Sequence, residues 1–302
     1  MANIKLGNKI FNDIEEVKVN TVEGEKVIFS LGGGTEVLDT LVKALIEKTP
    51  YELKSNVEGV IAEKAFMNDY LITSVNLPSV TSVGETAFLS CQSLKSVDLP
   101  SVTSIEAGAF NSCLSLTSVN MPSVTSIGEG AFRGCYDLTK ADMLSVTSIG
   151  EGAFAYCEAL ASVNIPSVTS IEEMTFVGCR SLASVNMPLA KSVGMGAFGE
   201  CKSLTKIDLP SVTSIGQQAF VNCTALAAVI LRTTETVCVV DLTAFANTPL
   251  LRGLGHFYVP ASMYESYRAV YETAANVDTP GFFDILFRKI EDYPEITETN
   301  LT

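Results

Sequence analysis

Apolar and polar positions follow a pattern that recurs every 22 residues over residues 57–248. In the unit that runs from Leu94 to Ser115, the apolar positions are Leu94, Val97, Leu99, Val102, Ile105, Ala109, Phe110 and Cys113. A fixed period of this length predicts a solenoid, in which each coil buries its apolar side against the neighbouring coils. The LxxLxL segment and the VTSI segment each read as a short strand. Pro100 ends the first one, because proline has no N–H for a ladder hydrogen bond.

Two columns of this repeat are nearly invariant. Phenylalanine recurs at Phe66, Phe88, Phe110, Phe132, Phe154, Phe176, Phe198 and Phe220, and cysteine recurs from Cys91 to Cys223 in the same steps. We therefore expect the rings to stack on one another and the seven column cysteines to be buried, free thiols, because an odd number cannot pair completely and cysteine packs as a small apolar residue. Disulfides between adjacent coils are the alternative.

A further column holds Gly84, Gly128, Gly150, Gly194 and Gly216 but also Glu106 and Glu172. Because glutamate also occurs there, we expect glycine in this column to reflect a turn preference and not a need for positive φ.

The segments on either side of the repeat read as caps. Residues 1–56 predict a small β-hairpin unit followed by one helix, whose apolar positions are Leu38, Leu41, Val42, Leu45 and Ile46 and which ends at Pro50. Gly32–Gly34 lie between the two; we interpret them as a flexible connector and not a phosphate cradle, because no Lys-Ser/Thr pair follows.

Residues 249–302 predict a helical cap. One helical face would carry Tyr264, Tyr267, Val270 and Tyr271, and another Phe282, Phe283, Leu286 and Ile290. The open end of a solenoid presents an apolar cross-section and a bare sheet edge, so these faces are expected to cover it. An aromatic ligand box is the alternative, and residues 293–302 are expected to fray.

The net charge of the chain excludes some classes of partner. The net charge is −14 and no basic stripe is present, which argues against nucleic acid and against anionic membranes. The chain has no run of 18 apolar residues, so the sequence predicts no membrane span. The first 20 residues lack the basic head and apolar stretch of a signal peptide, so we expect either a signal already removed or another route out of the cell.

Reaction chemistry is not visible in the sequence. The single histidine, His256, lies outside the repeat, and no G-x-S-x-G elbow occurs. The turn acids Glu85, Glu106, Glu129 and Glu151 imply no cleft, and no Cys/His spacing suits zinc. We therefore predict no enzyme, cofactor or metal, and keep a hydrolase using His256 as a remote alternative.

Two sets of surface positions are candidate binding sites. The first is the outward side of the LxxLxL strands, with short polar or basic residues at Asn76, Asp98, Asn120, Lys140, Asp142, Asn164, Asn186, Lys206 and Asp208. One interpretation is that these residues bind sugar hydroxyls or a protein loop. The alternative is that they form hydrogen bonds only with one another along the stack. The second is an edge ridge in the variable columns that flank Phe and Cys, with Arg133, Tyr136, Tyr156, Arg180 and Lys202. Tyr and Arg are common binding anchors, and neutral drift in exposed turns is the alternative.

The repeat LxxLxLPxxVTSIGxxAFxxCxx resembles the BspA-like leucine-rich repeats of bacterial surface antigens. That resemblance implies a right-handed superhelix with a parallel sheet on its inner face, a non-enzymatic binding or adhesion role, and display at the cell surface or outside the cell. Asp69, Ala141, Leu144 and the Leu189-Ala190-Lys191 triplet depart from the pattern, so the coils that contain them are expected to be less regular.

The sequence thus predicts three parts: an N-terminal unit (1–56), a solenoid (57–248) and a C-terminal cap (249–302). The expected partner is a host or microbial surface protein or glycan. The alternative function is a structural part of a larger assembly, such as a phage tail or a surface layer.

Overall fold

The computed structural model describes residues 49–54, 58–275 and 286–292, together with the backbone of four N-terminal strands. Those strands form two antiparallel pairs, β1 (Ile4–Leu6) with β2 (Lys9–Phe11) and β3 (Glu16–Thr21) with β4 (Gly24–Ser30). The expected helix over 38–46, the Gly32–Gly34 connector, Phe282, Phe283 and the frayed end lie outside the described residues.

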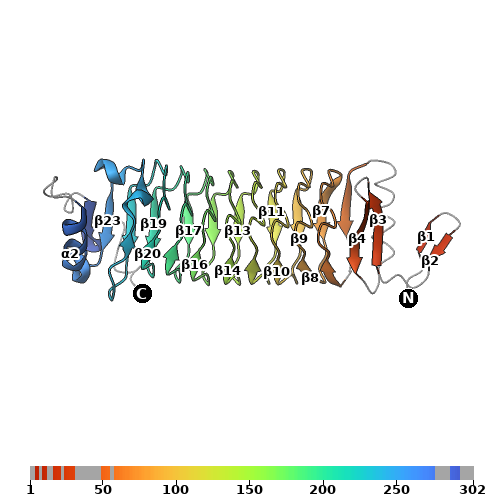
Figure 1. Cartoon of the computed structure of the whole chain (residues 1–302), viewed down its shortest axis with the longest axis horizontal. Helices are drawn as coiled ribbons and strands as arrows, with labels where there is room; N and C mark the ends of the chain where they lie inside the picture. The colour runs from red at the N-terminus through yellow and green to blue at the C-terminus, as the bar shows by residue number, and fades with distance from the viewer. Residues whose placement is uncertain are drawn as a thin grey trace.

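The repeats stack as parallel coils along a nearly straight axis (Figure 1). Their LxxLxL segments form β5 (Tyr51–Lys54), β7 (Ile72–Asn76), β9 (Ser96–Asp98), β11 (Ser118–Asn120), β13 (Lys140–Asp142), β15 (Ser162–Asn164), β17 (Ser184–Asn186), β19 (Lys206–Leu209) and β21 (Ala228–Leu231). Neighbouring strands pair in parallel with a register that advances one repeat, as in Ser96 with Ser118.

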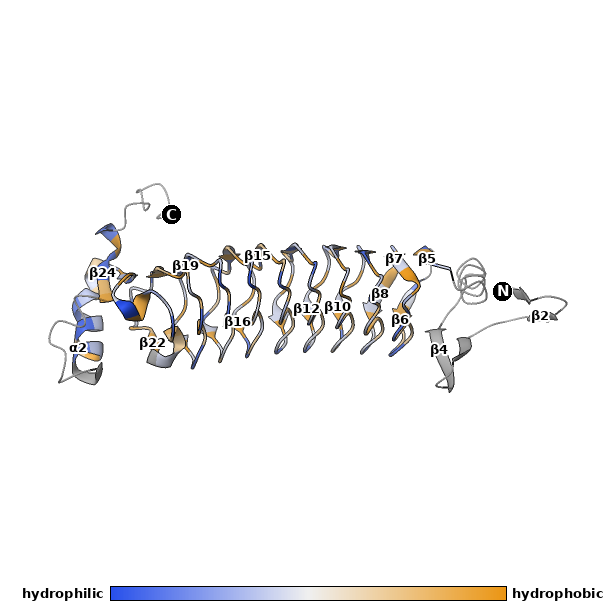
Figure 2. Ribbon diagram, turned by 90° about the horizontal axis from the view of Figure 1, so that it is seen from above, coloured by the Kyte–Doolittle hydropathy of each residue, from blue (hydrophilic) through white to orange (hydrophobic). Residues whose placement is uncertain are grey.

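The VTSI segments form a second ladder on another side of the rod (Figure 2). It comprises β6 (Gly59–Ile61), β8 (Val80–Val83), β10 (Ser104–Ile105), β12 (Ser126–Ile127), β14 (Ser148–Ile149), β16 (Ser170–Ile171), β18 (Ser192–Val193), β20 (Ser214–Ile215) and β22 (Val239–Val240). β4 joins its N-terminal end by pairing with β6. Two short strands in each coil therefore face different sides, as the repeat pattern predicts.

The phenylalanine column is the core of the rod. From Phe66 to Phe245 each ring stacks on the next, with centroids 5.0 to 5.5 Å apart and planes within 14° of parallel. Each column cysteine is buried and free, and its thiol donates a hydrogen bond of 3.0 to 3.4 Å to the carbonyl of the phenylalanine 25 residues earlier. The structure thus confirms stacked rings and free thiols.

A third ladder of backbone hydrogen bonds runs through the turns that carry the AF dipeptides. From Phe66 to Phe220, each phenylalanine N–H donates to the carbonyl of the residue that precedes the phenylalanine of the next coil, at 2.7 to 2.9 Å. This ladder is continuous, whereas the LxxLxL sheet is interrupted between β11 and β13 and between β17 and β19, and the VTSI sheet between β14 and β16. The turns therefore hold the coils in register where the strands do not.

The irregular repeats have different local consequences. Two sheet interruptions border the coil that contains Ala141 and Leu144, as expected. The Leu189-Ala190-Lys191 coil keeps β18 paired on both sides, but its β17 does not pair with β19, so this coil is also less regular, as expected. Asp69 replaces the first column cysteine and accepts hydrogen bonds from the N–H groups of Leu71 (2.9 Å) and Ile72 (3.2 Å) and from the Tyr51 hydroxyl. It thereby satisfies the backbone at the start of the stack.

Four of the repeat glycines lie very close to the preceding coil, which the sequence did not reveal. Gly84, Gly128, Gly150 and Gly194 do not adopt positive φ, as expected. A Cβ at any of them, however, would lie 2.5 to 2.9 Å from backbone atoms of the preceding coil. These four glycines therefore also allow close approach between coils, which a turn preference alone does not include, while Glu106 and Glu172 show that other coils accommodate a side chain in this column.

A C-terminal cap closes the stack. It contains η1 (Leu242–Phe245), η2 (Leu250–Arg252), β23 (His256–Val259), η3 (Ala261–Met263), α2 (Tyr264–Ala275), β24 (Phe287–Lys289) and η4 (Ile290–Asp292). β23 and β24 extend the LxxLxL sheet beyond β21. The hydroxyl of Tyr267 accepts from the Cys238 N–H at 2.9 Å, and that of Tyr271 accepts from the Val240 N–H at 2.7 Å. These tyrosines cover the core as predicted, but Val270 does not, because it faces away and is 45% exposed.

Candidate functional site

The outward column of the LxxLxL sheet is a set of short polar ladders. Asn120 Nδ2 donates to Asp98 Oδ1 at 2.7 Å, and Asn186 Nδ2 donates to Asn164 Oδ1 at 2.8 Å. Lys140 forms an ion pair with Asp142. Over most of this face the candidate residues therefore bond one another. This is the alternative to partner binding, in which the column only forms hydrogen bonds along the stack.

The edge ridge resolves into separate groups. The guanidinium of Arg133 lies 5.5 Å from the centroid of the Tyr156 ring. Arg180 instead pairs with Glu158 at 3.0 Å and approaches Glu200 at 3.8 Å. The structure brings Arg133 and Tyr156 together, while Tyr136 and Lys202 remain exposed side chains outside both groups.

Tyr156 lies in a column of left-handed backbone, which Ser112 and Glu200 share with φ of 60° and 61°. Its φ is 61°, in the left-handed region, and the equivalent residues of the adjacent coils are Gly134 and Gly178 with φ of 71° and 74°. A Cβ at Gly178 would lie only 2.6 Å from Cδ1 of the tyrosine ring. The glycine of the next coil therefore provides the space that the Tyr156 ring occupies.

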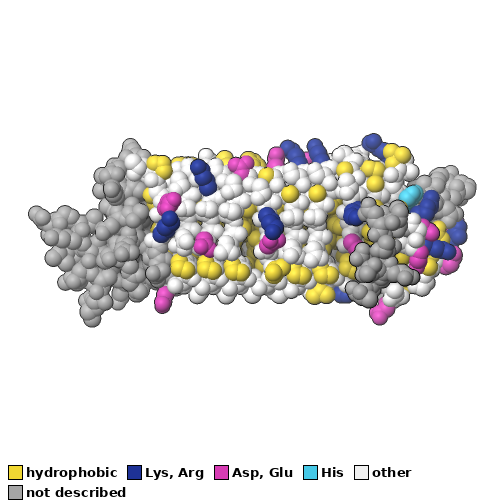
Figure 3. Space-filling view, turned by 180° about the vertical axis from the view of Figure 1, so that it is seen from behind, with side chains coloured by type: hydrophobic (Ala, Val, Ile, Leu, Met, Phe, Trp, Pro, Cys, Tyr) yellow, Lys and Arg dark blue, Asp and Glu magenta, His cyan; other side chains and the backbone are white. Residues whose placement is uncertain are grey.

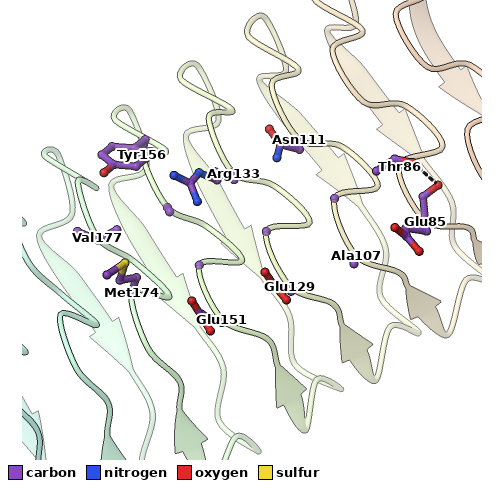
Figure 4. A pocket seen from close by; sticks show the side chains of 14 residues that line it. Glu85, Thr86, Ala107, Asn111, Glu129, Arg133, Glu151, Tyr156, Met174 and Val177 are labelled. Carbon is purple, nitrogen blue, oxygen red and sulfur yellow. Dashed lines mark hydrogen bonds between the residues drawn. The ribbon is translucent and has the colours of Figure 1, made fainter.

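These residues border a groove of about 320 Å³ that crosses the AF turns of successive coils (Figure 4). Glu129 and Glu151 lie along one side of it, and Arg133 and Tyr156 lie along the other. Glycines Gly108, Gly130 and Gly152 also line it, so no side chains fill it there. From the sequence, we expected no cleft at the turn acids. That expectation is wrong, because Glu85, Glu129 and Glu151 all line this groove.

The described residues offer little reaction chemistry. His256 lies on β23 with its ring 6.0 Å from that of Tyr258. Within the part of the chain that the structure describes, no group of three or more His, Cys, Asp or Glu side chains could hold a metal ion. Burial raises the pKa of the six column thiols from Cys91 to Cys201, to about 12 for Cys179, so these six are poor nucleophiles at neutral pH.

The charged side chains of the described residues can be followed on one face of the rod. The face shown in Figure 3 carries scattered charged side chains of both signs among mostly uncharged ones. None of the helices in the described segments combines the length and apolar character needed to cross a bilayer.

Two solved structures are similar to this chain. A leucine-rich repeat protein from T. pallidum is 30% identical, with a TM-score of 0.49, and the match covers 63% of this chain and 88% of that one. A leucine-rich repeat protein from Bacteroides ovatus is 22% identical, with a TM-score of 0.53, over 82% of this chain and 70% of that one. Comparison with curated proteins gives no match.

Stacked 22-residue coils with a parallel LxxLxL ladder define a leucine-rich-repeat solenoid. The model of the BspA type leucine rich repeat region matches residues 59–167 and 147–276, in six copies. The chain belongs to this family.

Proposed function

We propose that this chain is a non-enzymatic binding or adhesion protein that presents its repeat surface, outside the cell, to a protein or glycan partner. The observation that carries the proposal is the Arg133–Tyr156 pair beside the groove across the AF turns. Placement outside the cell rests on the family resemblance.

The left-handed backbone does not single out Tyr156, because Ser112 and Glu200 adopt the same φ at the equivalent positions of other coils. What distinguishes Tyr156 is a large aromatic side chain on the surface beside Arg133. An exposed cation–π contact such as that with Arg133 contributes about 0.5–1 kcal/mol. The side chain is still 39% exposed. An exposed tyrosine beside an arginine at the edge of a groove suits a contact made outside the chain, because Tyr and Arg are enriched among the residues that contribute most to binding energy.

The test is capture from arrays of host and bacterial surface proteins and glycans. The double variant Arg133→Ala/Tyr156→Gly removes both side chains while installing the residue that the adjacent coils use, so its fold is expected to be intact. The matched control, Tyr136→Ala/Arg180→Ala, removes the same residue types elsewhere on the edge. We expect the groove variant to weaken partner binding roughly 30-fold, as for a hot spot of 2 kcal/mol, and the control to change it little. Equal binding by wild type and the groove variant would refute the proposal.

The proposal also excludes catalysis through His256. If any turnover were detected in the purified protein, His256→Ala should leave its rate unchanged; loss of turnover with retained folding would favour the hydrolase alternative.

A further inference from the structure

A second cavity lies on the LxxLxL face near the C-terminal cap. It has a volume of about 730 Å³ and is lined by Asn186, Met187, Asp208, Pro210, Arg232 and Ile290, among others. This size is within the range of small-molecule sites, and the mixture of apolar walls with a few polar groups is typical of them. It is separate from the groove at Arg133 and Tyr156.

The cavity lies where the LxxLxL ladder is interrupted between β17 and β19. In regular coils the residue after the strand donates to the next coil, as Ile165 N–H does to the Asn186 carbonyl at 3.0 Å. The equivalent bond from Met187 to Asp208 is not formed in this part of the described chain. The gap therefore opens the sheet where its outward polar column and its apolar interior meet.

Arg232 supplies hydrogen-bond donors at this gap. Its Nε and Nη2 bind the Asp208 carboxylate at 2.8 to 3.0 Å. A guanidinium has five N–H groups, so three remain after these bonds. Nη1 is buried and, among the described residues, has no acceptor. A buried donor without an acceptor is uncommon in a native structure and calls for an explanation.

Acceptors lie beside these donors. Asn186 uses its amide NH₂ in the ladder bond to Asn164, which leaves its Oδ1 for another partner. The Asp208 side chain remains 44% exposed despite its pairing with Arg232, and Glu291 also lines the cavity. Donors and acceptors are thus interspersed, and Arg232, Asp208 and Glu291 together leave a net charge of only −1.

This mixture selects one ligand chemistry. A carboxylate ligand would meet Asp208 and Glu291, and an ammonium ligand would meet Arg232. A hydroxyl group both donates and accepts, so it matches the two kinds of group at once, and the apolar walls suit the C–H faces of a ring. We propose that this cavity binds a neutral sugar residue of a glycan, with Asn186, Asp208 and Arg232 as its polar contacts.

The chain provides a matched pair of variants for the test. Asn186→Ala and Asn120→Ala each remove an asparagine from the same column, and each removes one exposed ladder bond to the preceding coil. Only Asn186 lines the cavity. Any difference between the two variants in sugar binding therefore reports the cavity and not the ladder.

The experiment is a glycan array probed with the whole chain, followed by calorimetric titration with the best neutral sugar and with glucuronic acid and spermine as charged probes. We expect binding of a neutral sugar at millimolar concentration or better, a roughly tenfold loss in Asn186→Ala, as for one hydrogen bond of about 1.4 kcal/mol, and no change in Asn120→Ala. Binding of only the charged probes, no binding of neutral glycans, or equal binding by the two variants would overturn the proposal. Because Arg133 and Tyr156 are intact throughout, these results do not bear on the edge groove.

Discussion

At the scale of single residues, stability is concentrated in side chains that repeat identically. Phe154 is fully buried between Phe132 and Phe176, with ring centroids 5.2 and 5.5 Å away. Each ring is therefore supported on both sides, and its loss leaves a space that neighbouring rings fixed by the backbone ladder cannot fill.

We expect Phe154→Ala to lower the free energy of unfolding by roughly 3–5 kcal/mol, since it leaves a cavity in a close-packed core. Urea denaturation followed by circular dichroism measures this. Tyr136→Ala is the control, because that side chain is 47% exposed and its loss should cost under about 0.5 kcal/mol. Similar losses in both variants would contradict a core made of stacked rings.

Alanine substitutions at two glycines, both with left-handed backbone, test whether the Tyr156 ring occupies the space beside Gly178. Gly178→Ala introduces both positive-φ strain and a clash with the tyrosine ring, whereas Gly130→Ala introduces the strain with its nearest side-chain atom 3.9 Å away. We expect Gly178→Ala to be the more destabilising substitution by about 1 kcal/mol or more. Adding Tyr156→Gly should remove the difference between the two, and a difference that persists in that background would show that the ring is not its cause.

At the scale of elements, the cap is anchored by hydrogen bonds from α2 to the last coil. The hydroxyl of Tyr271 accepts from the Val240 N–H and donates to the Cys238 carbonyl at 2.6 Å. This single group satisfies two buried backbone groups at the end of the stack.

Tyr271→Phe should therefore leave both backbone groups without a partner and cost roughly 1–3 kcal/mol. Hydrogen exchange measured by mass spectrometry should show faster exchange in α2 and β22 than in the central coils. Val270→Ala is the control on the same helix, because that side chain is exposed. Unchanged protection of α2 in Tyr271→Phe would mean that apolar packing alone holds the cap.

The sequence predicts the elements well where stacking alone determines them. The period of Phe110 and Cys113 locates the coils, the core and the thiols, because identical coils need identical buried residues. The departure at Leu189-Ala190-Lys191 marks the coil at which β17 and β19 do not pair, but it does not reveal a cavity there, because that depends on how neighbouring coils lie relative to one another. Arg232 was missed for that reason: it follows the last regular repeat, and only the structure pairs it with Asp208 in a cavity that Asn186 also lines.

At the scale of the whole molecule, the thiol column makes stability depend on pH. Burial raises the pKa of six of these cysteines, from Cys91 to Cys201, above the ordinary value of 9.0. Below pH 9 the thiols are neutral in both folded and unfolded chains. Above it, only the unfolded chain loses protons, so stability falls as the pH rises from 9 toward 12.

We expect the free energy of unfolding, measured in urea with a reductant present, to be constant with respect to these groups below pH 9. Above pH 9 it should fall by up to about 1.4 kcal/mol per pH unit for each buried thiol. The double variant Cys157→Ala/Cys179→Ala should show a shallower fall than wild type. An equal slope in both proteins would mean that the fall comes from other groups.

The most direct test of the stacked-coil account is the distance between spin labels placed at repeat-equivalent positions. Cysteine introduced at Thr81 with Thr169, or at Thr81 with Thr213, separates the labels by four or six repeats, and the buried native thiols should not react. One coil advances about 4.8 Å, so pulsed electron resonance should give backbone separations near 19 and 29 Å, the second pair being longer by about 10 Å. Equal distances, or a shorter one for the Thr81–Thr213 pair, would contradict the account.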